Sequence, residues 1–148
     1  ILNQNRNEMN GVENFHIFTK WASSKHPMSF HYTKTKSLIG IACNKNSIWA
    51  YFNFTKAPNI TDDETKDGYN KIIIRKKFDN NLENIALKKD WGSKNLFIEN
   101  VNAFLKMLEN TNEILLEFSW YGNNSVNFRY FTDDAFQVIK SLKYKCGY

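Results

Sequence analysis

The segment from Thr55 to Gly68 is the first place where side chains of this sequence could do chemistry. It carries most of the local negative charge, on Asp62, Asp63, Glu64 and Asp67. Several carboxylates on a flexible loop are the ligands that calcium takes, but their spacing here differs from an EF-hand loop, so we expect a solvated acidic loop. Loops this long are uncommon in compact domains and often functional. The segment is therefore a candidate partner-binding region, and a mobile crossover is the equal alternative.

Groups suited to catalysis or metal binding are sparse elsewhere. The three histidines, His16, His26 and His31, lack the spacing of zinc sites, and we expect each to have a surface or structural role. The sequence has no glycine-flanked serine elbow and no catalytic cysteine signature. Its six glycines form neither a G-x-G-x-x-G pattern nor a Walker pattern, the two sequence patterns that bind phosphate. We therefore expect a protein that is not an enzyme and uses no metal or cofactor.

The two cysteines, Cys43 and Cys146, lie far apart and outside any CxxC or Cys/His ligand spacing. We predict that they form one disulfide in an oxidising compartment. Such a bridge closes a loop of roughly 100 residues and constrains the unfolded chain by up to about 4.7 kcal/mol on the chain-entropy model. Two unrelated buried thiols are the alternative.

The start of the chain agrees with export. It begins at Ile1 without an initiator methionine or an apolar signal-like segment, which is typical of a mature protein whose export signal has been removed. A truncated chain is an equally good explanation. No run of about 18 apolar residues is present, so we expect no transmembrane segment.

The four tryptophans divide into two pairs. Trp21 and Trp49 fall in strand patterns, which predicts core positions, whereas Trp91 and Trp120 lie at or next to turns. Exposed tryptophan and tyrosine often dominate binding energy at interfaces. Trp91, Trp120 and the adjacent Tyr121 are therefore candidate partner-binding residues, and burial in the core is the alternative.

Strands must position most of these groups. Period-two alternation predicts strands at Phe15–Trp21 and at Met28, Phe30 and Tyr32, a hairpin of Leu38–Cys43 with Ile48–Phe54, and strands at Lys71–Lys77, Asn84–Lys88 and Leu96–Ile98. The clearest hairpin joins Ile114–Tyr121 to Ser125–Phe131, because a glycine and two asparagines between them tolerate the backbone angles of a tight turn.

Two helices complete the pattern. Asn100–Glu109 has one apolar face and Asn100 near its start. Thr132 is predicted to cap a final helix, with Asp133 and Asp134 in its first turn and lysines in its last turn. The buried stripe of that helix would be Ala135, Val138, Ile139 and Leu142.

This order of elements predicts a mainly β, α+β fold. We expect an antiparallel β-sandwich or open barrel, with the short helix and the C-terminal helix packed at one side. A length of 148 residues suits one domain. We assign residues 1–12 to an N-terminal extension and residues 13–148 to a single β-rich domain.

Basic residues outnumber acidic ones, 20 to 15, which gives a formal charge of +5 and weakly favours an acidic partner. They are spread along the chain, at Arg75–Lys77, Lys88–Lys89 and between Lys140 and Lys145, rather than gathered in one arm that could follow phosphates. We therefore do not expect nucleic-acid binding as the main function. Such binding would have to use Arg75, Lys76, Lys77, Lys88 and Lys89 interleaved with Trp91.

Three segments carry a family resemblance: IGIACNKNSIWAYFNF from Ile39, FLKMLENTNEILLEFSWYG from Phe104 and NFRYFTDDAFQVIKSLKYKCGY from Asn127. In order and spacing they resemble the TagO/VasI-like exported proteins associated with bacterial type VI secretion, over roughly residues 13 to 148. The resemblance implies a periplasmic, non-enzymatic β-rich domain with a Cys43–Cys146 bridge. The chain departs from the family in its insertion at 55–68 and its basic, Asn/Lys-rich composition.

These observations lead to one main functional hypothesis. We expect a periplasmic immunity or inhibitor protein that binds an exported toxin, such as a bacteriocin that attacks peptidoglycan, and blocks it sterically. A type VI secretion accessory protein is the first alternative, and a nucleic-acid-binding domain is the second. The partner in the main hypothesis is a protein.

Overall fold

A computed structural model of the chain describes residues 2–6, 11–29, 31–61, 63–66, 69–78, 81–89 and 92–148. The fold is mainly β with two helices, as predicted. The strands are β1 (Leu2–Arg6), β2 (Glu13–Phe18), β3 (Ala22–Ser23), β4 (Lys36–Cys43), β5 (Ile48–Phe54), β6 (Asp63–Lys66), β7 (Tyr69–Phe78), β8 (Asn81–Lys89), β9 (Asn95–Ile98), β10 (Glu113–Trp120) and β11 (Asn124–Phe131). The helices are α1 (Val101–Glu109) and α2 (Ala135–Cys146).

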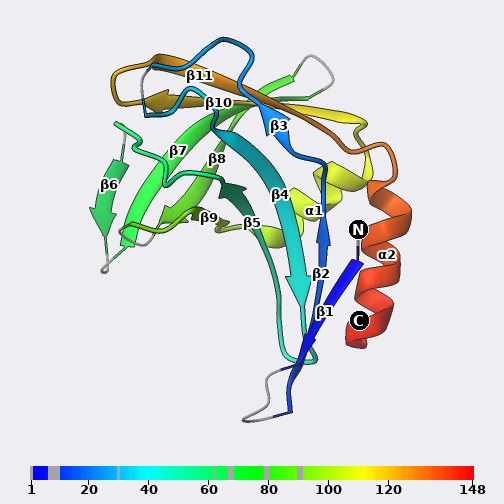
Figure 1. Cartoon of the computed structure of the whole chain (residues 1–148). Coiled ribbons are helices and arrows are strands. Elements are labelled where there is room, and N and C mark those ends of the chain that lie inside the picture. The colour runs from blue at the N-terminus through cyan, green and yellow to red at the C-terminus, as the bar shows by residue number, and fades with distance from the viewer. Residues whose placement is uncertain are drawn as a thin grey trace.

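The strands form one strongly bent antiparallel sheet. Its main path runs β1-β2-β4-β5-β9-β8-β7-β10-β11, with β3 paired to β4 and β6 paired to β7. The bend places the β10–β11 hairpin across from β4 and β5 (Figure 1). The sheet does not close into a barrel, although Ser24 forms a single bridge with Phe128 and the Lys25 N–H donates to the Asn127 carbonyl at 2.8 Å.

The two predicted hairpins are confirmed. Strand β5 has the predicted bounds, and β4 begins two residues before its predicted start. The Asn44 side-chain oxygen accepts from the backbone N–H groups of Asn46 and Ser47 at 2.9 and 3.0 Å, which fixes the polar turn between these strands. The turn between β10 and β11 contains Gly122 at φ 74°, a conformation that favours glycine.

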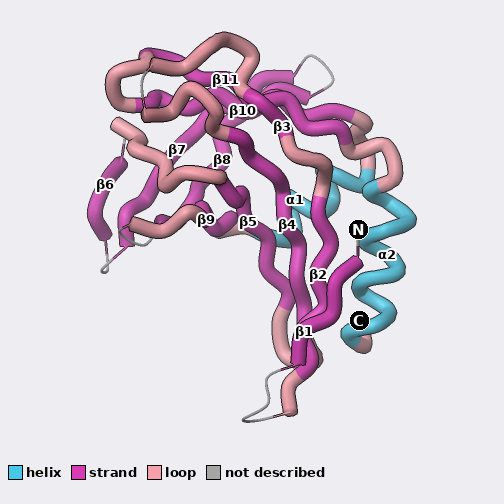
Figure 2. Tube along the Cα trace, viewed as in Figure 1, coloured by secondary structure: helices cyan, strands magenta, loops and turns pink. Residues whose placement is uncertain are grey.

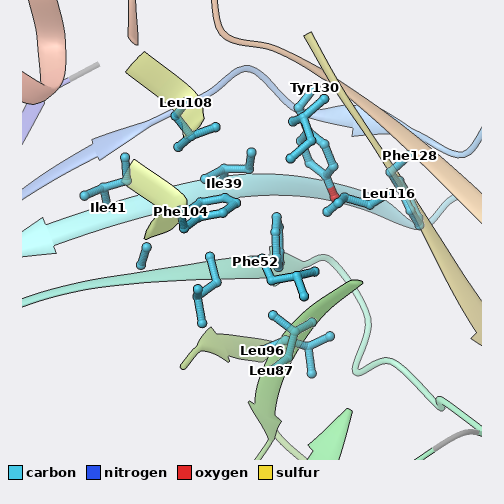
Figure 3. Packing of buried hydrophobic residues seen from close by; sticks show 14 of the residues in the cluster. Ile39, Ile41, Phe52, Leu87, Leu96, Phe104, Leu108, Leu116, Phe128 and Tyr130 are labelled. Atoms are coloured by element: carbon cyan, nitrogen blue, oxygen red, sulfur yellow. The ribbon is translucent and has the colours of Figure 1, made fainter. Parts of the chain in front are cut away.

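An aromatic cluster fills the inside of the bent sheet. The Phe52 ring lies in its centre, edge-on to Phe104 at 5.8 Å and to Phe118 at 6.4 Å, and tilted against Tyr130 at 5.8 Å (Figure 3). Edge-to-face pairs at these centroid distances are the favoured geometry of buried rings. We call the side of the sheet that carries these rings the inner face.

Both helices lie on the same side of the sheet (Figure 2), with α2 against β2 and α1. Asn100 caps α1 as predicted, because its side-chain oxygen accepts from the Ala103 N–H at 3.2 Å. The predicted stripe of α2 is confirmed: Ile139 and Leu142 are fully buried, and Ala135 and Val138 pack against the core. Neither described helix has the length and apolar character needed to cross a bilayer.

The predicted cap of α2 is wrong. The Thr132 hydroxyl is buried and donates to the Thr111 carbonyl at 2.7 Å, so it ties the chain to the end of α1 instead of capping α2. Asp134 occupies the N-cap position, and its side chain makes no capping hydrogen bond. The first turn holds no acidic residue, because the helix starts at Ala135, after both aspartates.

Three other predictions need correction. Residues 2–6 of the expected extension form β1, which pairs with β2 from Leu2 opposite Ile17 onward. Residues 31–34 form a turn rather than part of a strand. The Tyr32 ring packs edge-on against the Trp120 ring, with 5.2 Å between the ring centroids. The expected loop at 55–68 contains the edge strand β6 and the buried Ile60.

The predicted disulfide is present. It joins Cys43, at the end of β4, to Cys146, at the end of α2, with a Cα–Cα distance of 6.1 Å. Both residues are buried. The bridge therefore fastens the C-terminal helix to an early strand, 103 residues away in sequence.

Candidate protein-binding surface

The acidic candidates are only partly placed by the structure. Asp62 and Asp67 lie outside the described residues, and so does Trp91. Asp63 and Glu64 are the first residues of β6, where they pair with Ile72 and Lys71 of β7. Two of the four acidic residues of the segment thus lie on a strand rather than on an open loop.

Trp120 is a core residue, so its predicted role as an exposed contact is wrong. Only 1% of the residue is exposed, and its ring packs against Phe54 and Phe128 as well as Tyr32. Tyr121 follows it at the start of the turn and is 66% exposed. The turn therefore buries the tryptophan and presents the tyrosine.

Trp21 shows the opposite error. The sequence pattern predicts a core position, yet the residue is 48% exposed. Strand β2 ends at Phe18, and Trp21 lies in the connection to β3, where the alternation of a regular strand no longer applies.

The structure brings the stem of the acidic segment beside Tyr121. The Tyr121 N–H donates to the Asn59 carbonyl at 2.8 Å, and the Thr61 N–H donates to the Ser119 carbonyl at 2.8 Å. Ile60, between Asn59 and Thr61, forms an isolated β-bridge with Trp120 and is buried. The residues that lead into the acidic segment thus lie beside Tyr121.

A second segment supports the turn from the other side. The Asn123 side-chain oxygen accepts from the Ser29 N–H at 2.5 Å, and its amide donates to the Tyr121 carbonyl at 3.2 Å. We call the region formed by Asn59–Thr61, Tyr121–Asn123 and His26–Ser29 the turn surface. Sequence reasoning missed Asn59, Asn123 and Ser29, because nothing in a single sequence marks which turn residues bond to each other.

The turn surface contains a small depression. Its volume is about 50 Å³, and it is lined by His26, Pro27, Met28, Asn123, Ser125, Val126 and Asn127. Sites for small molecules usually measure roughly 300–1,000 Å³. The depression can accept one side chain of a partner but is too small for a typical metabolite.

The basic candidates lie on two paired strands. Arg75, Lys76 and Lys77 are consecutive in β7, and Lys88 and Lys89 end β8. The Lys89 ammonium donates to the Pro58 carbonyl, so it supports the stem of the acidic segment. Lys88 is exposed.

The histidines have different environments. His16 is half-buried, its Nδ1 has no hydrogen-bond partner, and burial lowers its pKa below the ordinary value of 6.5. His26 lines the depression, and the His31 carbonyl accepts from Lys56. Within the described part of the chain, no three His, Cys, Asp or Glu side chains group in a way that could hold a metal ion.

Comparison with known proteins gives no relative: no family model, curated protein or solved structure matches this chain.

Proposed function

We propose that this protein is an exported immunity or inhibitor protein that binds a toxin and blocks it sterically, with the turn surface as its contact. The observation that carries the proposal is the pairing of Tyr121 with the stem of the acidic segment. The exposed Tyr121 ring lies on a turn whose backbone is hydrogen-bonded to Asn59, and Thr61 is hydrogen-bonded to Ser119 just before that turn; Asn59 and Thr61 lead directly into the acidic residues in sequence.

The hydrogen bonds around Tyr121 favour a strong contact between its ring and a partner. Backbone hydrogen bonds hold the turn to Asn59 on one side, and Asn123 holds it to Ser29 on the other. A ring on a rigid turn loses little conformational entropy when a partner covers it. Tyrosines with this placement are frequent hot spots of protein interfaces.

The charge of the acidic segment favours a basic partner. A toxin that degrades peptidoglycan acts on an anionic polymer, and a cleft that collects such a substrate is itself basic. We propose that the acidic segment, which follows Thr61 in sequence, occupies that cleft. The Cys43–Cys146 bridge supports a location outside the reducing cytosol, where such a toxin acts.

A binding and protection experiment tests the proposal. The oxidised protein is titrated with peptidoglycan-degrading bacteriocins, and cells that export it are challenged with the same toxins. We expect Tyr121→Ala to weaken binding by about 30-fold, the equivalent of roughly 2 kcal/mol at a hot spot, and to abolish protection. Tyr144→Ala is the matched control, because Tyr144 is a more exposed tyrosine on α2.

Two results would contradict the proposal. One is the absence of both binding and protection across the toxin panel. The other is an equal loss of affinity in Tyr121→Ala and Tyr144→Ala, which would place the contact away from the turn surface.

A further inference from the structure

The charges of the chain are unevenly distributed along the sequence. Residues 14–61 contain six lysines and no aspartate, glutamate or arginine. All 15 acidic residues of the chain therefore lie outside this stretch. The stretch includes the strands β3, β4 and β5 and all but the first residue of β2. A surface built mainly from these strands is basic unless acidic residues of other elements approach it.

The fold brings two of these lysines to the same end of the sheet, where β4 begins and β5 ends (Figure 1). Lys36 is the first residue of β4 and pairs with Ser23 of β3. Its N–H donates to the Thr55 hydroxyl oxygen at 2.9 Å, and the Thr55 N–H donates to the Lys36 carbonyl at 3.0 Å. Lys56 directly follows Thr55, so the backbones of the two lysines lie on neighbouring segments.

A turn adds a third lysine. Lys34 ends the turn formed by residues 31–34, two residues before Lys36. The Thr35 N–H donates to the Tyr32 carbonyl at 2.9 Å, and the Lys56 ammonium donates to the His31 carbonyl. The turn is therefore held in place beside the start of β4.

The connection into β3 adds a fourth lysine and a tryptophan. The Thr19 N–H donates to the Ile39 carbonyl at 3.0 Å, and Ala22 pairs with Ser37. Lys20 and Trp21 lie between these two attachment points, beside the first half of β4. We define the lysine corner as Lys20, Trp21, Lys34, Lys36 and Lys56.

The side chains of the lysine corner are open to solvent. All four lysines are exposed, and Trp21 is 48% exposed. Among the described residues, the ammonium groups of Lys20, Lys34 and Lys36 form neither an ion pair nor a hydrogen bond. Their charges are therefore available to a partner.

The strands next to the lysine corner do not offset its charge. Strand β9 flanks β5, and β11 contacts the segment after β3 through the Ser24–Phe128 bridge; neither strand contains an acidic residue. Glu13 lies at the other end of the sheet, beyond Phe15, which pairs with Cys43. The distance along β4 from Lys36 to Cys43 is roughly 23 Å at the usual rise of a strand. That exceeds the screening length of about 8 Å at physiological salt.

We infer that the lysine corner attaches the protein to a bilayer that contains anionic phospholipids, with the lysines near the headgroups and Trp21 at the interface. Clusters of lysine are attracted by the negative surface potential of such a bilayer. Tryptophan is enriched at membrane–water interfaces, because its ring is apolar while its N–H can still donate a hydrogen bond. The exposed Trp21 directly follows Lys20, so both kinds of group occur together.

The type of cation favours a membrane over a folded partner or nucleic acid. Lysine supplies every charge of the corner, and its ammonium is a hydrated point charge without the planar geometry of arginine. Such charges suit a surface of many mobile headgroups, whereas partners that present fixed carboxylates or phosphates are commonly bound by arginine pairs. Binding of single-stranded nucleic acid also uses several rings in succession, and the corner has one.

Membrane attachment goes beyond the proposed toxin binding and is independent of it. The lysine corner and the turn surface have no residue in common. Tyr121→Ala is expected to weaken toxin binding and to leave membrane attachment unchanged. The two proposals can therefore fail separately.

Co-sedimentation with lipid vesicles tests the inference on the oxidised protein. The vesicles consist either of phosphatidylcholine alone or of equal parts phosphatidylcholine and phosphatidylglycerol. We expect binding at low salt only to the anionic vesicles. Lys34→Gln and Lys36→Gln should each weaken it by about 5-fold, and the double variant by about 25-fold, the loss expected for one and two lysines near an anionic bilayer.

Lys140→Gln is the matched control, because Lys140 is an exposed lysine of α2 and its substitution removes the same charge from the whole protein. It should leave vesicle binding unchanged. Trp21 gives a second measurement. Anionic vesicles should shift the tryptophan fluorescence of the wild type to shorter wavelength, and Trp21→Ala should remove this shift. Thermal melting of each variant shows whether the fold is retained.

Three outcomes would overturn the inference. The first is equal binding, or no binding, to the neutral and the anionic vesicles. The second is an equal loss of binding in Lys140→Gln and Lys36→Gln, which would show an effect of net charge rather than of this corner. The third is binding of double-stranded DNA that depends on Lys34 and Lys36 while the vesicles are not bound, which would identify nucleic acid as the partner.

Discussion

Strand β5 shows the contrast between the two faces of the sheet within six residues. Phe52 and Phe54 point into the core and are fully buried, whereas Trp49 and Tyr51 lie on the opposite side of the sheet, the outer face, and are half-buried. The residue types are alike on both sides, so aromatic character alone does not decide which face becomes the core.

The packing partners explain the difference. The inner face of β4 and β5 is covered by α1, α2 and the β10–β11 hairpin, so its rings have neighbours on every side. The ring contacts of Trp49 and Tyr51, among the described residues, run along the sheet to His16 of β2 and Phe97 of β9. We therefore expect the inner rings to contribute more to stability than the outer rings.

The largest expected effect separates the two faces directly. Phe52→Ala removes the ring at the centre of the aromatic cluster and should lower the free energy of unfolding by about 3–5 kcal/mol. Tyr51→Ala, one residue away, should cost much less, because its ring keeps part of its surface in water. Urea denaturation of both variants measures the difference. Equal losses would mean that the outer rings are as important to stability as the core.

Removing the Cys43–Cys146 disulfide tests how much it contributes to the stability of the fold. The Cys43→Ala/Cys146→Ala variant should lose about 2–5 kcal/mol of stability, since the loop that it closes spans most of the chain. Denaturation of the variant, compared with the oxidised wild type, measures this loss. A loss below about 1 kcal/mol would show that α2 is held mainly by Ile139, Leu142 and the Lys143–Glu109 ion pair at 3.0 Å.

The sequence predicts the inner face better than the outer one. Strands β4, β5, β10 and β11 and the buried stripe of α2 follow from alternation and helical period, because a buried face imposes a regular pattern. The Cys43–Cys146 disulfide is predictable because two cysteines allow only one intramolecular pairing. These features depend on residue type and on short-range order.

The candidate site could not be predicted in the same way. Trp120 and Tyr121 are neighbours of similar type, and Trp120 is covered because Tyr32, Phe54 and Phe128 from other segments pack against its ring. The contact between the Tyr51 and Phe97 rings on the outer face requires β9 to pair with β5, although more than 40 residues separate the two residues in sequence. Pairings of this length are set by the whole fold, and a single sequence does not indicate them.

A smaller effect concerns a buried polar contact on the inner face. The Tyr130 hydroxyl donates to the Ser37 hydroxyl oxygen at 2.7 Å, and burial raises the pKa of Tyr130. Tyr130→Phe should cost about 1–2 kcal/mol because it leaves the fully buried Ser37 hydroxyl without this partner. Tyr51→Phe, the matched change on the outer face, should stay within about 0.5 kcal/mol.

A double-mutant cycle sharpens this test. If the two hydroxyls interact as described, Tyr130→Phe combined with Ser37→Ala should cost less than the sum of the single changes. If the stability losses of the two single variants simply added up in the double variant, the hydroxyl contact would be contradicted. The loss in Tyr130→Phe would then come from packing alone.

The smallest expected effect is the pH response of the outer face. Burial lowers the pKa of His16, so between that value and 6.5 the unfolded chain binds a proton that the folded protein does not. Stability from this residue is present above pH 6.5 and is lost as the pH falls through that window. His16→Phe removes the titrating group and keeps a ring next to Phe18 and Trp49. Its stability relative to the wild type, measured by denaturation at several pH values from 8 to 5, should therefore rise on acidification. A difference that does not change with pH would mean that His16 is as free to bind a proton in the folded protein as in the unfolded chain.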